Sequence, residues 1–166
     1  MRMRLNYLIL LGLPMLLPFP SAFGLQAPST PPDRKAILAV VQALDAAWNA
    51  RDAARFSAVF SADGSFGFPF EGIALRGRNE IREHYAKLFP TLPPGLRHVT
   101  TIGDFEIIDS SLVTVDFEVD ILPADSGTGT SPAPLVHYHG FGLGVRVDSG
   151  WCIRSARVYA LFKQGA

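Results

Sequence analysis

Cysteine is nearly absent from this chain, because Cys152 is the only one among 166 residues. A single cysteine excludes a disulfide within the chain and a metal site built from several thiolates. An excess of charge is also lacking, since 15 basic residues balance 15 acidic ones. No stripe of lysine and arginine is visible in the sequence, so we do not expect nucleic acid as a partner.

The N-terminus lacks an apolar run long enough to cross a bilayer, which takes about 20 residues. Residues 1–24 combine Arg2 and Arg4 with a short apolar stretch, interrupted by Pro14, and a closing group of small residues. This layout is typical of a secretory signal peptide, with a second possible cleavage site after Ala27. We expect a secreted or periplasmic protein without stable membrane association after cleavage; a retained N-terminal anchor is the alternative.

The remaining sequence is long enough for one domain with a core of its own. A proline-rich linker is expected at residues 25–32, followed by an α+β domain at 33–163. Helical spacing of apolar residues predicts a first helix that carries Trp48 on its buried side. Asp52 is placed to cap a second, shorter helix, and a third is expected to bury Tyr85.

Long strands are predicted after the third helix, at about residues 96–108, 110–122, 135–148 and 151–162. The second of these alternates cleanly, with valine and phenylalanine on one face and Thr114, Asp116, Glu118 and Asp120 on the other. Strict alternation is typical of a strand with one buried face. The sequence therefore predicts three helices packed on one face of a curved antiparallel sheet.

Three segments carry a resemblance to a known family: "AILAVVQALDAAWNARDAARFSAVFSADGSF", "LRGRNEIREHY" and "GFGLGVRVDSGWCIRSARVY". In this order they resemble the NTF2-like superfamily, within it the SnoaL-like and SgcJ/EcaC groups, and more distantly ketosteroid isomerase. The resemblance spans residues 33–162. It implies a cone-shaped barrel with a deep pocket between the helices and the concave sheet, and a homodimer formed through the outer face of the sheet.

The isomerase's functional residues are largely missing from this sequence. Its general-base aspartate corresponds to Phe68, its oxyanion tyrosine falls near Leu44, and its protonated acid falls near Leu143. Only the tyrosine of the third helix persists, as Tyr85. The departure argues against steroid-type isomerisation by that mechanism.

The segment "VHYHGFGLGV" holds two of the four histidines. In a strand, His137 and His139 share a face with Phe141, and we expect this more apolar face to point into the core. Arg157 and Tyr159 share the corresponding face of the last strand. In the predicted pocket, polar side chains therefore line one end and aromatic side chains line the rest. The polar residues are Tyr85, His137, His139, Arg157 and Tyr159, and the aromatic ones are Trp48, Phe56, Phe60, Phe66 and Phe68.

Three roles are open for the histidines. A metal would need a third ligand. His98 is the candidate, because the strand carboxylates are expected to face away from the histidines. We expect no metal at this site. In acid–base chemistry, His139 would take a proton while Arg157 holds an oxyanion and Tyr85 assists. In the third role, the histidines satisfy hydrogen bonds around a buried Arg157 or sit exposed at the sheet edge.

The expected partner is a small hydrophobic or carbonyl-containing ligand. The chain would then be an enzyme of isomerase, cyclase or hydrolase type acting on a carbonyl compound. The alternative is a non-catalytic module for ligand binding or dimerisation. Members of the SgcJ/EcaC group are often labelled oxidoreductases. We expect no cofactor, because "GFGLG" lies in a predicted strand and does not open a helix as a nucleotide-binding motif does.

Overall fold

The computed structural model describes residues 34–124 and 132–160. The expected signal peptide (1–24) and linker (25–32) lie outside the described residues, as do both ends of the expected domain. Among the helices of the described segments, none is long and apolar enough to cross a membrane.

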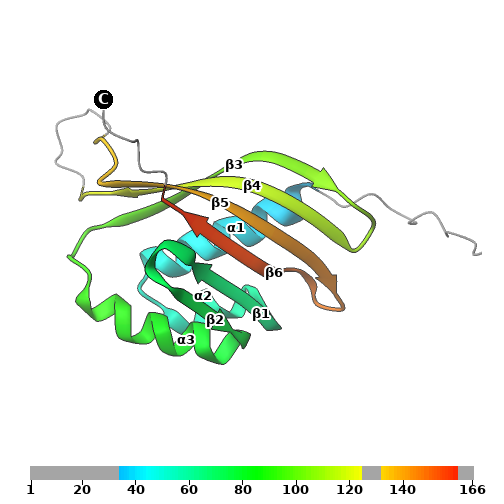
Figure 1. Cartoon of the computed structure of the whole chain (residues 1–166), viewed down its shortest axis with the longest axis horizontal. Coiled ribbons are helices and arrows are strands. Elements are labelled where there is room, and N and C mark those ends of the chain that lie inside the picture. The colour runs from blue at the N-terminus through cyan, green and yellow to red at the C-terminus, as the bar shows by residue number, and fades with distance from the viewer. Residues whose placement is uncertain (1–33, 125–131, 161–166) are drawn as a thin grey trace, which may run out of the picture.

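Six strands form one curved sheet in the spatial order β2-β1-β6-β5-β4-β3 (Figure 1). They are β1 (Phe60–Phe68), β2 (Ile73–Arg76), β3 (Arg97–Ile107), β4 (Leu112–Leu122), β5 (Val136–Val147) and β6 (Gly150–Tyr159). All neighbours pair antiparallel except β1 and β6, which are parallel. The expected antiparallel sheet is therefore wrong at this pair. β1 and β6 are separated by most of the domain, so no hairpin fixes their relative direction.

Three helices lie on one side of the sheet, with α1 beneath the long strands and α3 near β1 and β2 (Figure 1). They are α1 (Arg34–Asn49), α2 (Ala53–Ala58) and α3 (Gly77–Leu88), with short 3-10 turns at Pro69–Glu71 and Phe89–Thr91. Both β1 and β2 precede α3, so the helices are not all N-terminal to the sheet as predicted. The α+β class and the helical layer over a curved sheet are confirmed.

Local sequence explains where the helices begin and what they bury. The Asp52 carboxylate accepts a hydrogen bond from the Arg55 amide at 2.9 Å, so the predicted cap of α2 is confirmed. Aromatic side chains dominate the core between the helices and the sheet. Its fully buried members are Ala47, Trp48, Phe56, Phe60, Phe66, Ile81, Tyr85, Phe89, Ala156 and Val158.

The alternation of β4 distinguishes the two faces of the sheet. Val113, Val115 and Val119 are buried on the face that the helices cover, here called the inner face. Asp116 and Glu118 are exposed on the opposite, outer face. The predicted alternation of β4 is therefore confirmed.

Glycines on β5 make room for the inner-face side chains of β4. Gly140 pairs with Phe117, and a Cβ atom at Gly140 would overlap the Phe117 ring and lie 3.0 Å from the Arg157 carbonyl oxygen. Gly144 pairs with Val113, and a Cβ atom there would lie 2.7 Å from the Val113 methyl group. The glycine-containing face of β5 is consequently the inner one.

Replacing Gly140 with alanine should therefore destabilise the protein. We expect Gly140→Ala to lower the free energy of unfolding by about 1–3 kcal/mol, because the added methyl group overpacks the Phe117 ring. Gly142→Ala is the matched control, since its Cβ would lie 3.5 Å from Phe117, an ordinary contact. Urea unfolding of both variants tests this; an equal loss in the two would contradict the packing account.

Candidate functional site

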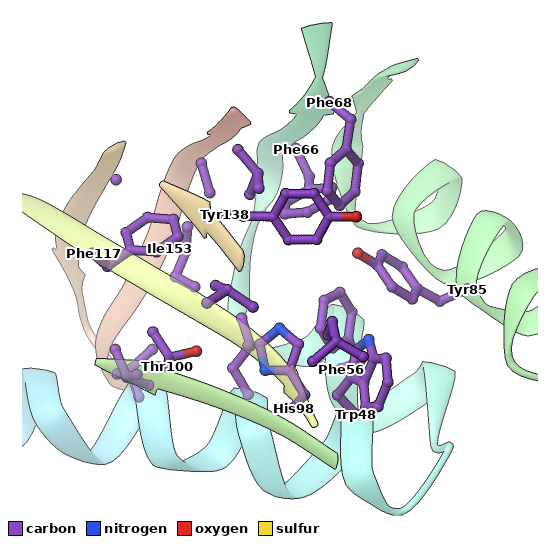
Figure 2. Close-up of a pocket in the computed structure, with 18 of the residues that line it drawn as sticks. Trp48, Phe56, Phe66, Phe68, Tyr85, His98, Thr100, Phe117, Tyr138 and Ile153 are labelled. Carbon is purple, nitrogen blue, oxygen red and sulfur yellow. The ribbon is translucent and has the colours of Figure 1, made fainter. Parts of the chain in front are cut away.

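A cavity of about 460 Å³ lies between the helices and the inner face of the sheet. This volume is within the range of small-molecule sites. Most of its wall is apolar (Figure 2). The main apolar contributors are Leu44, Trp48, Phe56, Phe66, Phe68, Leu88, Val115, Phe117, Val119, Ile121 and Val158.

Five residues of the predicted pocket line this cavity: Trp48, Phe56, Phe66, Phe68 and Tyr85. They come from α1, α2, β1 and α3, so all three α-helices of the described segments contribute to the cavity. Phe60 is fully buried in the core and does not reach the cavity wall. The structure thus brings the aromatic part of the predicted set together around one space.

His137 and His139 lie elsewhere, and their predicted inward orientation is wrong. Directly opposite residues of antiparallel neighbours project from the same face, and His139 pairs with Glu118 while His137 pairs with Asp120. His137 Nδ1 is 2.7 Å from Asp120 Oδ1. Both histidines are therefore on the outer face, about two-fifths exposed.

Arg157 and Tyr159 also lie on the outer face, contrary to the prediction. They pair with Phe141 and His139, and Tyr159 is 42% exposed. The Arg157 guanidinium donates to the Ala156 carbonyl oxygen at 2.8 Å and to the Ser65 hydroxyl at 3.3 Å. Its partners are thus supplied within the chain, so this arginine does not call for an anionic ligand.

The error has one physical cause. Apolar content predicts the wrong buried face of β5, because Phe141 and Leu143 are on the same face as the histidines. The glycines were the better signal, because the inner face of β5 has to leave space for Phe117 and Val113 on β4. The inner face of β5 therefore presents Tyr138 to the cavity.

A histidine that the predicted set omitted lies in the cavity wall. His98 on β3 is 9% exposed and lines the cavity beside Trp48, with ring centroids 5.1 Å apart (Figure 2). Its Nδ1 is 2.8 Å from Asp45 Oδ1 on α1. A carboxylate only accepts hydrogen bonds, so Nδ1 carries a proton, and in the neutral form of the ring the lone pair is on Nε2. No described residue is hydrogen-bonded to His98 Nε2.

Three further hydrogen-bonding groups fix this pair. Asp45 accepts from the Thr100 amide at 2.9 Å and from the Thr100 hydroxyl at 2.7 Å. The Asn49 side chain accepts from the His98 amide at 2.7 Å and donates to the His98 carbonyl oxygen at 2.9 Å. Residues of α1 therefore fix the orientation of the imidazole. A catalytic base is commonly oriented in this way by a third group, here the Asp45 carboxylate.

The sequence carried a signal for these residues. Asp45 and Asn49 are four apart on a helix that is mostly apolar, and His98 and Thr100 are two apart on a strand. Each spacing places both members of a pair on one face. The two spacings do not reveal that these pairs meet, because that contact joins a helix to a strand far along the chain.

Two tyrosine hydroxyls lie on another side of the cavity. Figure 2 shows the Tyr85 and Tyr138 side chains directed toward the same part of the cavity. Burial raises the pKa of Tyr85 far above its ordinary value, and the charges of Glu71 and Tyr138 add to the shift. Burial, and then Glu71, also raise the pKa of Tyr138. Both side chains are therefore neutral hydrogen-bond donors at physiological pH.

Comparison with known proteins gives a consistent picture. The model of the SnoaL-like domain family matches residues 40–140. No curated protein matches the chain. Solved structures are similar in fold. One is a domain of unknown function with a cystatin-like fold from Nostoc punctiforme, with 23% identity over 80% of this chain and 79% of that one and a TM-score of 0.67.

Two further structures have the same fold. A ketosteroid isomerase-like protein from Erwinia carotovora is 21% identical over 77% of this chain and 95% of that one, with a TM-score of 0.61. An NTF2-like protein with a cystatin-like fold from Novosphingobium aromaticivorans is 18% identical over 81% and 84%, with a TM-score of 0.60. The predicted NTF2-like architecture is therefore confirmed.

The raised pKa of Tyr85 predicts how stability depends on alkaline pH. In the folded chain the protonated hydroxyl is favoured, so ionisation of Tyr85 favours the unfolded state. This contribution is complete at neutral pH and is lost as the pH rises above about 10, the ordinary tyrosine value. Tyr85→Phe should remove it.

Urea unfolding between neutral pH and pH about 11 would measure this effect. The free energy of unfolding should fall less steeply for Tyr85→Phe than for the original chain. Parallel slopes for the two proteins would show that the Tyr85 hydroxyl is not held neutral by burial.

Proposed function

Because the chain belongs to the SnoaL-like domain family, we propose that its cavity binds a small, mostly apolar carbonyl compound and that His98 moves a proton to or from it. The observation that carries this proposal is the His98–Asp45 pair in a wall that is mostly apolar. The group that acts differs from the predicted His139 and Arg157, whereas the class of ligand is the same.

His98 Nε2 is the proposed general base. Asp45 holds a proton on Nδ1, so in the neutral ring Nε2 carries the free lone pair, and the carboxylate stabilises the imidazolium that forms on proton transfer. The buried position of His98 keeps bulk water away from the reacting atoms. The same arrangement returns the proton at the end of the reaction.

Tyr138 and Tyr85 are the proposed hydrogen-bond donors to the carbonyl oxygen of the ligand. Proton removal from the carbon beside a carbonyl group leaves negative charge on the carbonyl oxygen, and neutral hydroxyl donors stabilise that charge. For a β,γ-unsaturated carbonyl compound the product of this step is a dienolate, and return of the proton from His98 to the γ-carbon shifts the double bond into conjugation with the carbonyl group, which completes an isomerisation. Atoms and electrons balance without a further reactant. We therefore place the chemistry in the isomerase class.

Replacing His98 tests this role. A ketone ligand would first be selected by thermal shift, because binding to the folded state raises its apparent stability. Incorporation of solvent deuterium at its α-carbon, followed by NMR, then reports proton abstraction. We expect His98→Gln to slow incorporation by about 100-fold or more, and Asp45→Asn to slow it as well. Arg157→Gln, on the outer face, should leave it unchanged.

The outcomes separate the proposals. Slower exchange in Arg157→Gln but not in His98→Gln would contradict the cavity account and support a role for His139 and Arg157, the residues predicted from the sequence. Ligand binding without any exchange in the original chain would instead identify a non-catalytic binding module. The finer membership in the SgcJ/EcaC group stays a prediction.

Export and dimerisation are further parts of the proposal. The mature chain of an exported protein should begin at Leu25 or Pro28, which intact-mass spectrometry of secreted material would determine. Exposed Phe141 and Tyr159 on the outer face support a homodimer through that face. Sedimentation equilibrium should then give twice the mass of one chain. Secreted material that still carries residues 1–24 would contradict the proposed cleavage. A monomer at high protein concentration would contradict the proposed homodimer.

A further inference from the structure

The outer face carries a group of metal-ligating side chains that the cavity account does not use. Glu118 on β4 lies directly opposite His139 on β5, and His137 follows two residues earlier on the same face of β5. The strand carboxylates and the two histidines therefore share one face. The carboxylates do not face away from the histidines as predicted, so Glu118 is available as a third ligand.

The three side chains are close enough to converge on one ion. Their ligand atoms all lie within 4.8 Å of one another, and His139 Nδ1 is 3.8 Å from Glu118 Oε1. Donors around a tetrahedral zinc ion lie roughly 3.4 Å apart, given bonds of about 2.0–2.1 Å. Small rotations of these three side chains would bring their ligand atoms to the shorter separation, and the side chains are free to rotate because they are two-fifths to one-half exposed.

A fourth residue orients one of the ligands. Asp120 Oδ1 lies 2.7 Å from His137 Nδ1, and a carboxylate in this position holds the proton on Nδ1. The lone pair of His137 Nε2 is then free for a metal. A carboxylate behind a histidine in this way is the usual outer-shell partner of a metal ligand. The two imidazole planes meet at 88°, with centroids 4.9 Å apart, so the rings do not stack.

We propose that Glu118, His137 and His139 bind one divalent transition-metal ion, with Asp120 as the positioning residue. Two imidazoles and one carboxylate favour Zn²⁺ and its neighbours over Mg²⁺ or Ca²⁺, which prefer oxygen ligands. Three protein ligands leave an open coordination position toward solvent. The ion joins β4 and β5 at opposite positions, so it stabilises the sheet at this point. The site is separate from the cavity and independent of its proposed chemistry.

Zinc titration of the full-length, untagged chain tests the site. Chelator-treated protein would be titrated with ZnCl₂ in competition with a chromophoric chelator, and again with MgCl₂. We expect one Zn²⁺ per chain, no comparable binding of Mg²⁺, and weaker binding at acidic pH because protons compete for the ligands. Zn²⁺ should also raise the melting temperature.

Variants separate a built site from adventitious binding. His137→Gln, His139→Gln and Glu118→Gln should each weaken Zn²⁺ binding at least tenfold and abolish the rise in melting temperature. Asp120→Asn should weaken it by about 10- to 100-fold. His84→Gln, on α3, is the matched control, and its affinity for Zn²⁺ should equal that of the original chain.

Metal-free melting temperatures check that each variant is folded, since the substituted side chains are on the surface. Zn²⁺ affinity equal to that of the original chain in His137→Gln and His139→Gln would overturn the proposal, as would the absence of binding by the original chain. Neither result would bear on His98, whose exchange assay requires no metal.

Discussion

Asp45 accepts hydrogen bonds from His98 Nδ1, the Thr100 amide and the Thr100 hydroxyl, all on β3. This carboxylate therefore ties α1 to the edge strand of the sheet. Asn49, one helical turn further on, binds both backbone polar groups of His98. The hydrogen bonds that hold α1 against the sheet also fix the His98 imidazole at the cavity wall. The packing of the helix and the orientation of the proposed base therefore depend on the same contacts.

Packing on the inner face explains why the cavity exists. Aromatic residues of α1, α2 and β1 surround it, while Phe117 lies against Gly140 on the neighbouring strand. A side chain at Gly140 would displace that ring from the wall. Among the polar groups of the cavity, His98 is held by its neighbours and Tyr85 is kept neutral by burial.

Patterns within single elements were predictable from the sequence. Alternation gave the faces of β4, helical spacing gave the buried side of α1, and Asp52 marked the start of α2. Relations between elements were harder. The face of β5 depends on its contact with β4, and Asp45 is 53 residues from His98. Apolar content favoured the wrong face of β5, because glycine contributes little to it although it marks close packing.

The central claim is that Asp45 holds the proton of His98 on Nδ1 and leaves Nε2 free toward the cavity. Long-range ¹H–¹⁵N NMR of histidine-labelled protein measures this tautomer directly, at a pH where imidazole rings are neutral. The account predicts a protonated Nδ1 for His98 in the original chain and loss of that preference in Asp45→Ala. A protonated Nε2 in the original chain, or a tautomer that does not respond to the substitution, would contradict it.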